Sequence, residues 1–266
     1  QGPSLFEKSP VDDMLRSGHL RLSVGLLDKA VGASCSLEYA VYGAAGLKLH
    51  QETGGGLHAT GLKVWPSARV LAEHVIGQRV QGKRILELGA GTGAVGLACG
   101  IAGAYSVVLS DRLVLSGLVT TRRQLQLLER NVSLNTPLLG DVLRVSVVEL
   151  DFAAPADERS SASAALRQHG PFDLILGSDI TYNRSAHPQL ALCLLQLLDV
   201  RIGIAGGRRS RAPTVLLAQQ VRQKDDMSCL IRTFQEAGLS THVVHSANSV
   251  DIIHVELAAA EALPAE

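Results

Sequence analysis

Aromatic side chains and an excess of either charge are what this sequence lacks most. Only 3% of the 266 residues are aromatic, and Lys plus Arg equals Asp plus Glu at 25 each. Proteins that bind single-stranded nucleic acid need aromatic rings on which bases stack, and polyanions or anionic membranes are attracted by net positive charge. The composition therefore argues against nucleic acid or a membrane as the main partner.

Cysteine is also scarce, and the four residues lie far apart in the chain, at Cys35, Cys99, Cys193 and Cys229. No C-x-x-C pair and no neighbouring His at the spacing of a zinc ligand accompanies them, so we expect no metal site. No apolar run reaches the roughly 18 residues of a membrane span, and no secretory signal pattern opens the chain. We expect a cytoplasmic protein, with the nucleus as the alternative compartment.

The composition that remains is that of an ordinary globular protein, with 46% apolar and 19% charged residues. No internal repeat or long linker divides the chain, so we expect one main domain over residues 37–257, and a monomer. Residues 1–36 would form an N-terminal extension, and residues 258–266 a C-terminal tail. The first three residues, Gln1-Gly2-Pro3, resemble the remnant of a tag cleavage site.

A strong turn signal lies near the start of this domain. The run Thr53-Gly54-Gly55-Gly56 separates two strand-like stretches, Leu37 to Leu49 and Lys63 to Trp65. A glycine-rich turn between such stretches is typical of a β-hairpin. Pro66 then begins a helix, because proline is favoured in the first helical turn.

Strand-like and helix-like segments alternate from residue 84 onward. The first five strand-like segments are continuous apolar runs, as in parallel strands that are covered on both faces. The expected strands are Arg84 to Leu88, Ser106 to Ser110, Leu143 to Leu150, Phe172 to Gly177 and Thr214 to Gln219, with Thr241 to His245 and Asp251 to Leu257 as an antiparallel pair. The expected helices are Ala94 to Ala102, Arg122 to Leu134, Gln189 to Asp199 and Met227 to Ala237, and the expected loops are Ala153 to Gly170 and Gly203 to Pro213.

This order predicts an α/β fold. We expect a doubly wound, mostly parallel, Rossmann-like sheet of seven strands, with an N-terminal β-hairpin extension and a C-terminal antiparallel strand pair. In such a sheet ligands bind at the carboxyl ends of the parallel strands, so the residues after each strand are the candidates for function.

The first parallel strand ends in a glycine turn that is typical of nucleotide binding. The run reads Glu87-Leu88-Gly89-Ala90-Gly91-Thr92-Gly93, and a helix follows it. Glycine lets the backbone turn sharply and approach a ligand closely, because it has no Cβ. The turn also satisfies G-x-G-x-x-G/A, with Ala94 as its last residue, so it leaves a nicotinamide or flavin dinucleotide open as the ligand.

Acidic residues follow the next two strands. Asp111 ends the second strand about 20 residues after the glycine turn, where a carboxylate can bind both ribose hydroxyls of a nucleotide. Asp151 ends the third strand, where it could accept a hydrogen bond from an adenine amino group while Phe152 covers the ring. A dinucleotide and an adenosine cofactor both require the first of these acids, so it does not separate them.

The fourth strand ends in a polar cluster that a dinucleotide fold does not require. Ser178, Asp179 and Tyr182 follow it, and they should face the same crevice as the glycine turn. Together with Thr60-Gly61-Leu62-Lys63-Val64-Trp65-Pro66 and the glycine turn, the segment Asp179-Ile180-Thr181-Tyr182 resembles the seven-strand S-adenosylmethionine-dependent methyltransferases. More narrowly, it is similar to family 16 of the protein methyltransferases, which act on lysine and carry an acid-x-x-Tyr signature.

The resemblance implies an enzyme that transfers methyl groups from S-adenosyl-L-methionine to a lysine side chain of a protein substrate. It also implies that Glu87 and the glycines Gly89, Gly91 and Gly93 hold the methionine part of the cofactor, Asp111 the ribose, and Asp151 with Phe152 the adenine. Trp65 would form a wall of the cofactor pocket, with Ser178 nearby, and Asp179 and Tyr182 would be the catalytic residues. Transfer to histidine or to a small molecule, and a non-catalytic protein that retains the pocket, remain alternatives.

Overall fold

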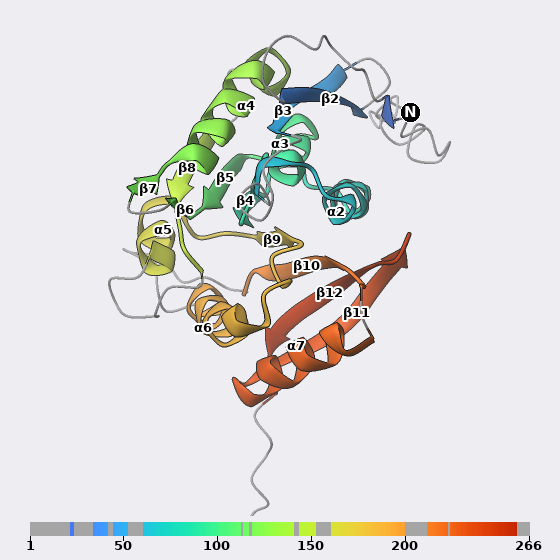
Figure 1. Cartoon of the computed structure of the whole chain (residues 1–266), viewed down its shortest axis with the longest axis vertical. Coiled ribbons are helices and arrows are strands. Elements are labelled where there is room, and N and C mark those ends of the chain that lie inside the picture. The colour runs from blue at the N-terminus through green and yellow to red at the C-terminus, as the bar shows by residue number, and fades with distance from the viewer. Residues whose placement is uncertain are drawn as a thin grey trace, which may run out of the picture.

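A seven-stranded sheet forms the centre of the computed structural model, which describes residues 22–23, 34–41, 45–52, 61–112, 114–116, 119–140, 144–152, 161–199, 212–222 and 224–259. The strand order is β11-β12-β10-β9-β4-β5-β8 (Figure 1). Strands β10, β9, β4, β5 and β8 are parallel, whereas β12 is antiparallel to both β10 and β11. The bounds are β4 Arg84–Leu88, β5 Ser106–Asp111, β8 Arg144–Glu149, β9 Leu174–Ser178, β10 Thr214–Gln220, β11 Leu239–Ala247 and β12 Val250–Leu257. The predicted fold class is confirmed.

Helices cover both faces of the sheet. On one face lie α2 (Pro66–Gly77), α3 (Ala94–Ile101) and α4 (Arg123–Leu139), and on the other α5 (Ser161–His169), α6 (His187–Leu198) and α7 (Lys224–Glu236). Neighbouring residues of β4 show the division, because Ile85 packs in the first apolar layer and Leu86 in the second. Two covered faces explain why the parallel strands are continuous apolar runs.

The N-terminal hairpin differs from the one expected. Strand β2 (Ser34–Val41) pairs antiparallel with β3 (Ala45–Glu52), and β1 (Leu22–Ser23) pairs with β2. The stretch expected to be one strand therefore contains parts of two, joined through residues 42–44. The expected hairpin turn, residues 53–56, lies outside the described residues. Its expected second strand is instead the segment that leads into α2, with Trp65 at the N-cap position.

Strand β3 is attached to α4 by two buried side-chain amides. Asn131 accepts a hydrogen bond from the His50 N–H at 2.8 Å and donates to the His50 and Thr92 carbonyl oxygens at 3.1 and 2.8 Å. Asn135, one helical turn later, bonds in the same way to the N–H and carbonyl of Lys48 at 2.9 and 2.6 Å. Both asparagines are 0% exposed. The hairpin is thus held to α4 by hydrogen bonds to the main chain of β3, and the apolar face of β3 packs in the core.

Three further elements were not expected from the sequence. Helix α5 lies within the predicted loop, and β6 (Val114–Ser116) pairs with β7 (Val119–Thr121) beyond the end of β5. Helix α4 also continues past its expected end, with Pro137 in its last turn. Residues 153–160 and 203–211 of the two predicted loops lie outside the described part of the chain. None of the helices described in the structure combines the length and apolar character needed to span a membrane.

Candidate active site

The glycine turn after β4 leaves space for backbone alone. Gly89 and Gly91 both have φ of +57°, a conformation that residues with a side chain rarely adopt. A Cβ on Gly91 would lie 3.0 Å from the Gly61 carbonyl oxygen, and one on Gly89 would lie 2.7 Å from Ile180 Cγ2 and 3.3 Å from Phe152 Cε1. The turn therefore meets the segment before α2 and the ends of β8 and β9 at one place, as the sequence predicted.

Two buried carboxylates accept hydrogen bonds from backbone N–H groups in this turn and in the helix that follows it. Glu87 Oε2 accepts the Gly96 N–H at 2.7 Å, and Asp111 Oδ2 accepts the Gly91 N–H at 2.8 Å. Burial raises the pKa of Glu87 to about 8, and the nearby Asp111 carboxylate acts in the same direction. Burial also raises the pKa of Asp111, while the N–H groups of Gly91 and Arg112 oppose that shift. Asp111 therefore holds the turn at Gly91, and Glu87 holds the first turn of α3 that follows it.

Glu87 is buried at the start of α3. Its side chain is 1% exposed and points toward the N-terminus of α3, on the same side of β4 as Ile85. The resemblance implied that Glu87 holds the methionine part of the cofactor, and that role stays a prediction. The alternation of side chains along a strand explains the orientation, because Ile85 and Glu87 lie on the same face of β4.

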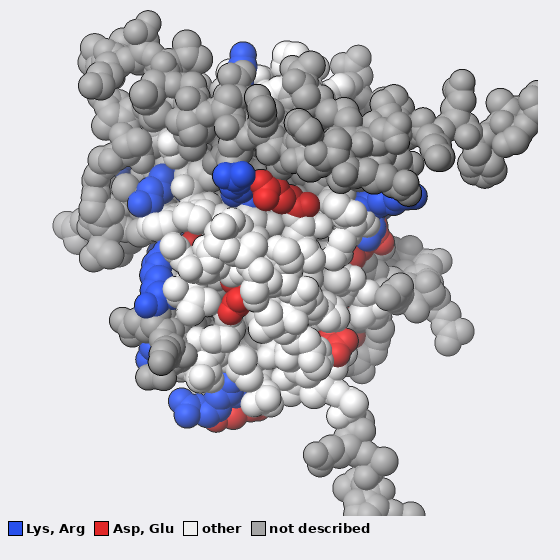
Figure 2. Space-filling view, turned by 90° about the vertical axis from the view of Figure 1, so that its right-hand side faces the viewer, with Lys and Arg blue, Asp and Glu red and all other residues white. Residues whose placement is uncertain are grey.

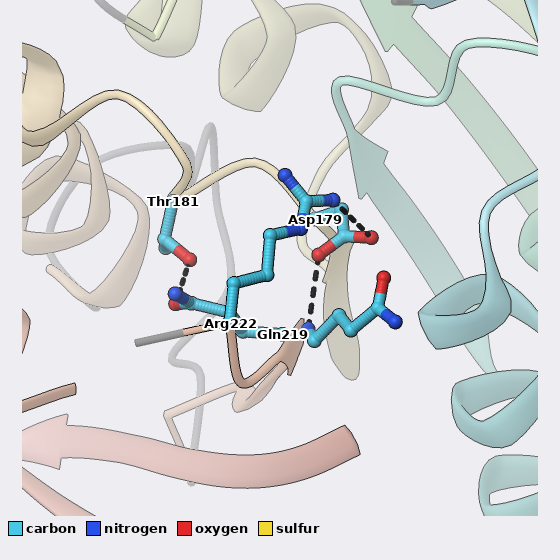
Figure 3. Close-up of polar contacts among 5 residues, drawn as sticks. Asp179, Thr181, Gln219 and Arg222 are labelled. Atoms are coloured by element: carbon cyan, nitrogen blue, oxygen red, sulfur yellow. Dashed lines mark hydrogen bonds and ion pairs between the residues drawn. The ribbon is translucent and has the colours of Figure 1, made fainter. Parts of the chain in front are cut away.

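Asp179 is buried after the end of β9, with one carboxylate oxygen in a hydrogen bond and the other in an ion pair (Figure 3). Its φ is +51°, and its N–H donates to the Ala218 carbonyl oxygen at 2.8 Å. The Gln220 N–H donates to Oδ1 at 3.0 Å, whereas Oδ2 has no hydrogen-bond partner. A nitrogen of the Arg222 guanidinium lies 3.7 Å from Oδ2. The acid is therefore held by the end of β10 and keeps one oxygen without a hydrogen bond.

The residues around Asp179 are fixed by their own contacts. The Thr181 hydroxyl donates to the side-chain oxygen of Gln219 (Figure 3). His187 Nε2 donates to the Thr181 carbonyl oxygen at 2.8 Å. Tyr182, by contrast, is 52% exposed. The turn after β9 thus contains a buried acid and, three residues later, an exposed aromatic ring.

Trp65, the last residue of the segment before α2, lies against two cationic side chains. The Lys63 Nζ is 3.8 Å from the centroid of its ring, and the Arg222 guanidinium carbon is 5.1 Å from it. Both distances are within the range of a cation–π contact. Arg222 therefore touches both the acid expected to be catalytic and the ring expected to line the cofactor pocket.

The remaining predicted site residues lie at the same edge of the sheet. Ser178 is half-buried at the end of β9, and Asp151 and Phe152 are half-buried directly after β8. Phe152 lies against the glycine turn, and the Asp151 carboxylate acts on the pKa of Asp111. The part of the chain that the structure describes contains no cluster of three His, Cys, Asp or Glu side chains suited to a metal ion.

Comparison with known proteins identifies the family. A model of the lysine methyltransferase family matches residues 43–227, well over half of the chain. The chain belongs to the lysine methyltransferase family. The zebrafish (Danio rerio) protein N-lysine methyltransferase METTL21A is 32% identical over 191 residues, which are 71% of this chain and 73% of the relative. The yeast (Saccharomyces cerevisiae) protein-lysine N-methyltransferase EFM6 is 27% identical over 184 residues, 65% of this chain and 68% of the relative.

A solved structure shares the fold of this lysine methyltransferase. The 16S rRNA N2 G1207 methyltransferase RsmC of T. thermophilus, in complex with AdoMet and guanosine, matches with a TM-score of 0.52 at 17% identity. The match covers 86% of this chain and 52% of that one, so this chain spans about half the length of the structure. The predicted family, enzyme class and cofactor, S-adenosylmethionine, are thereby confirmed.

The strand ends of the methyltransferase fit this cofactor. The glycine turn packs its backbone against Gly61, Ile180 and Phe152, and Asp111, Asp151 and Asp179 lie at the ends of β5, β8 and β9, at one edge of the sheet. Acidic groups at one edge suit a ligand that carries a positively charged sulfur. Asp179 Oδ2, which lacks a hydrogen bond, is a buried acceptor for a further donor.

The site also contains residues that sequence reasoning missed. Arg222, Gln219 and Gln220 all lie at the carboxyl end of β10 or just after it. Their signal was the one that found Asp111, Asp151 and Asp179, namely a position at the end of a parallel strand. Gly61 was quoted only as part of a motif, although its carbonyl oxygen limits the space at Gly91.

Proposed function

We propose that this methyltransferase uses Asp179 and Tyr182 to receive the side chain of a target lysine in a protein substrate. The observation that carries the proposal is the buried Oδ2 of Asp179, which has no hydrogen-bond partner at the strand end beside the glycine turn. A buried carboxylate oxygen without a donor is costly unless a ligand supplies one. An incoming alkylammonium group is such a donor.

The cofactor would lie along the neighbouring strand ends. In this proposal the turn at Gly89, Gly91 and Gly93 approaches its methionine part, and Asp111 binds the ribose hydroxyls. Asp151 and Phe152 hold the adenine, while Trp65 and Ser178 line the pocket. Glu87 contributes from beneath, because its carboxylate fixes the start of α3 and with it the shape of the turn.

The chemistry requires a neutral amine at the site. S-adenosylmethionine supplies a methyl group that is bound to a positively charged sulfur. The amine lone pair would form the new bond to the methyl carbon, and the electron pair of the broken carbon–sulfur bond would stay on sulfur. A lysine side chain has an ordinary pKa of about 10.4, so at neutral pH it arrives as an ammonium group without a free lone pair. Asp179 would capture and orient that group, which then loses its proton to water. The exposed ring of Tyr182 would guide the alkylammonium through a cation–π contact.

A protein is the substrate that the surface around the site favours. Figure 2 shows the face toward which β9 and the tip of the β11–β12 pair point in Figure 1, and the Lys and Arg residues of its described part lie mainly toward the margins. The described part of this face offers no concentrated positive charge for a nucleic acid backbone. A monomeric state and the cytoplasmic compartment stay predictions from the sequence.

The test is transfer of labelled methyl groups to protein. Lysate from cells that lack this protein is incubated with the purified enzyme and tritiated S-adenosylmethionine, and the labelled peptide is identified by mass spectrometry. We expect label on a lysine. Label on histidine or only in small molecules, or binding of the cofactor without any transfer, would contradict the proposal.

A matched pair of variants tests the role of Asp179. Asp179→Asn removes the charge but keeps an acceptor for the Gln220 N–H, so we expect methyl transfer to fall at least about 100-fold with unchanged cofactor affinity. Asp173→Asn is the control, because Asp173 lies at the opposite end of the same strand and bonds the Arg84 N–H. An active Asp179→Asn enzyme would exclude the assigned role.

A further inference from the structure

Arg222 is the cation that faces Asp179. The distance of 3.7 Å between a guanidinium nitrogen and Oδ2 is an ion-pair distance, but the two groups form no hydrogen bond. Attraction between the charges is therefore present while the hydrogen-bonding capacity of Oδ2 stays available. This arrangement matters only if Asp179 receives a lysine, so the inference rests on the proposed function.

An isolated carboxylate would be a poor partner for a lysine that must lose its proton. A negative charge beside an ammonium group favours the charged form and raises its pKa, which opposes formation of the neutral amine. A positive charge nearby acts in the opposite direction. The site therefore needs an acid that can orient the substrate and a cation that limits the effect of that acid.

We propose that Arg222 is a positioning residue that balances the charge of Asp179, so that the acid can orient the target lysine without keeping it protonated. The proton that the lysine loses goes to water, and the freed lone pair forms the new bond to the methyl group. Arg222 acts by offsetting the charge of Asp179 and by its own electrostatic effect on the pKa of the target lysine.

The structure holds both members of this pair from the same strand end. Asp179 is fixed to β10 by the Gln220 N–H, and Arg222 follows two residues later. On its other side the guanidinium lies 5.1 Å from the centroid of the Trp65 ring. A side chain held between a carboxylate and an aromatic ring keeps its charge at a defined place, although it is 44% exposed.

Other charged or titratable groups lie on the elements around β9 and β10, and most have contacts elsewhere. Lys63 lies over Trp65, His187 on α6 bonds Thr181, and Glu87 on β4 bonds Gly96. On α2, Arg69 pairs with Glu73 and His74 contacts His245. Tyr182 and Arg184 follow β9. Among the residues that the structure describes, Arg222 is the cation within ion-pair distance of Asp179. The charge balance at Oδ2 therefore depends on this arginine.

The pH dependence of methyl transfer tests the inference. The probe is the labelled protein band that the unmodified enzyme produces in lysate from cells lacking it, measured as initial rate under saturating tritiated S-adenosylmethionine. Loss of a unit charge about 4 Å away shifts a pKa by about three units at an effective dielectric constant of about 20, and by somewhat under one unit at about 80, the value of bulk water. The Arg222 side chain is 44% exposed, so the shift should lie near the lower limit. We expect Arg222→Gln and Arg222→Met to move the alkaline midpoint of the rate upward by about one pH unit. Near neutral pH the rate should fall about tenfold, and at high pH it should return to within about twofold.

Three further measurements separate this role from a structural one. Arg222→Lys should keep the midpoint, because it restores the charge, and Arg69→Gln should keep it as the control for an exposed arginine on α2. Calorimetric affinity for S-adenosylmethionine should stay within about threefold in every variant. A rate that falls equally at all pH values, or an unchanged rate, would overturn the inference. A lower KM with an unshifted midpoint would overturn it too, because Arg222 would then merely compete with the lysine. Absence of any labelled band with the unmodified enzyme would instead contradict the proposed function.

Discussion

Replacement of Glu87 by Gln should change how the stability of the methyltransferase depends on pH. Glu87 is 1% exposed beneath the glycine turn, and burial, assisted by Asp111, raises its pKa from 4.5 to about 8. The N–H groups of Gly96 and Val95 lower it, but not enough to offset burial. In the unfolded chain the same carboxyl has its ordinary pKa. Near neutral pH it is therefore protonated in the folded protein and ionised in the unfolded one.

The sign and size of the effect follow from this difference. Between pH 4.5 and about 8 the folded state binds one more proton at Glu87 than the unfolded state, so the free energy of unfolding falls as pH rises. The contribution is fully present below 4.5 and is lost as pH rises through about 8. The slope is about 1.4 kcal/mol per pH unit, or about 3 kcal/mol between roughly pH 5.5 and 7.5. Gln has no proton to lose, so the variant lacks this slope.

Urea denaturation of both proteins at these two pH values is the assay. We expect the difference in unfolding free energy between the Gln variant and the parent protein to move by about 3 kcal/mol in favour of the variant at the higher pH. Glu73→Gln, at an exposed position on α2, should leave the pH dependence unchanged. If the unfolding free energies of the parent and of Glu87→Gln change equally with pH, Glu87 is ionised in the folded state and the argument from burial is wrong.

Two further substitutions probe the turn and the hairpin. Gly91→Val places a side chain against backbone at a positive φ, so affinity for S-adenosylmethionine should fall at least about tenfold. The affinity is measured through the fluorescence emission of Trp65, the only tryptophan in the chain. Gly77→Ala is the control, because a Cβ on Gly77 would lie in open space. Asn131→Ala leaves buried backbone groups of the hairpin without partners and should lower the free energy of unfolding by roughly 2–5 kcal/mol in urea titrations. Ser133→Ala, on the exposed side of the same helix, should cost under about 1 kcal/mol, and equal effects of the two helix substitutions would exclude the attachment role.

The sheet was predictable because its strands are covered on both faces. Each parallel strand is mostly apolar and bounded by polar residues, so its position follows mainly from hydrophobicity, although β4 contains the buried Glu87. The first hairpin was not predictable in the same way. A run of glycines at Gly54 to Gly56 gave a stronger turn signal than Gly43, which lies in the short connection between β2 and β3. Helix α5 was missed because Ser and Ala were taken as loop residues, although Ala162 and Ala165, three residues apart, are both buried.

The site was predictable as far as strand ends identify residues. Asp111, Asp151 and Asp179 each follow a parallel strand, and the structure brings all three to one edge. Arg222 was missed, because a single arginine after a strand does not differ in sequence from a solvated one. Its importance depends on a distance of 3.7 Å to a residue 43 positions earlier, which no local pattern contains. The inward orientation of Glu87 could have been read from the alternation along β4.

Asn131 and Asn135 of α4 hold β3 by its main chain, so the evolutionary constraint at these contacts lies on residues of the helix and not on those of the strand. On β3 their amides bond main-chain atoms of Lys48 and His50, which every amino acid except proline provides. Side chains at these two positions are thus free to diverge, while Leu47 and Leu49, buried on the other side, set which way the strand faces. Homologous chains could exchange much of the hairpin sequence without redesign of the sheet, provided that both amides on α4 and the Gln51 contact with Val64 are kept.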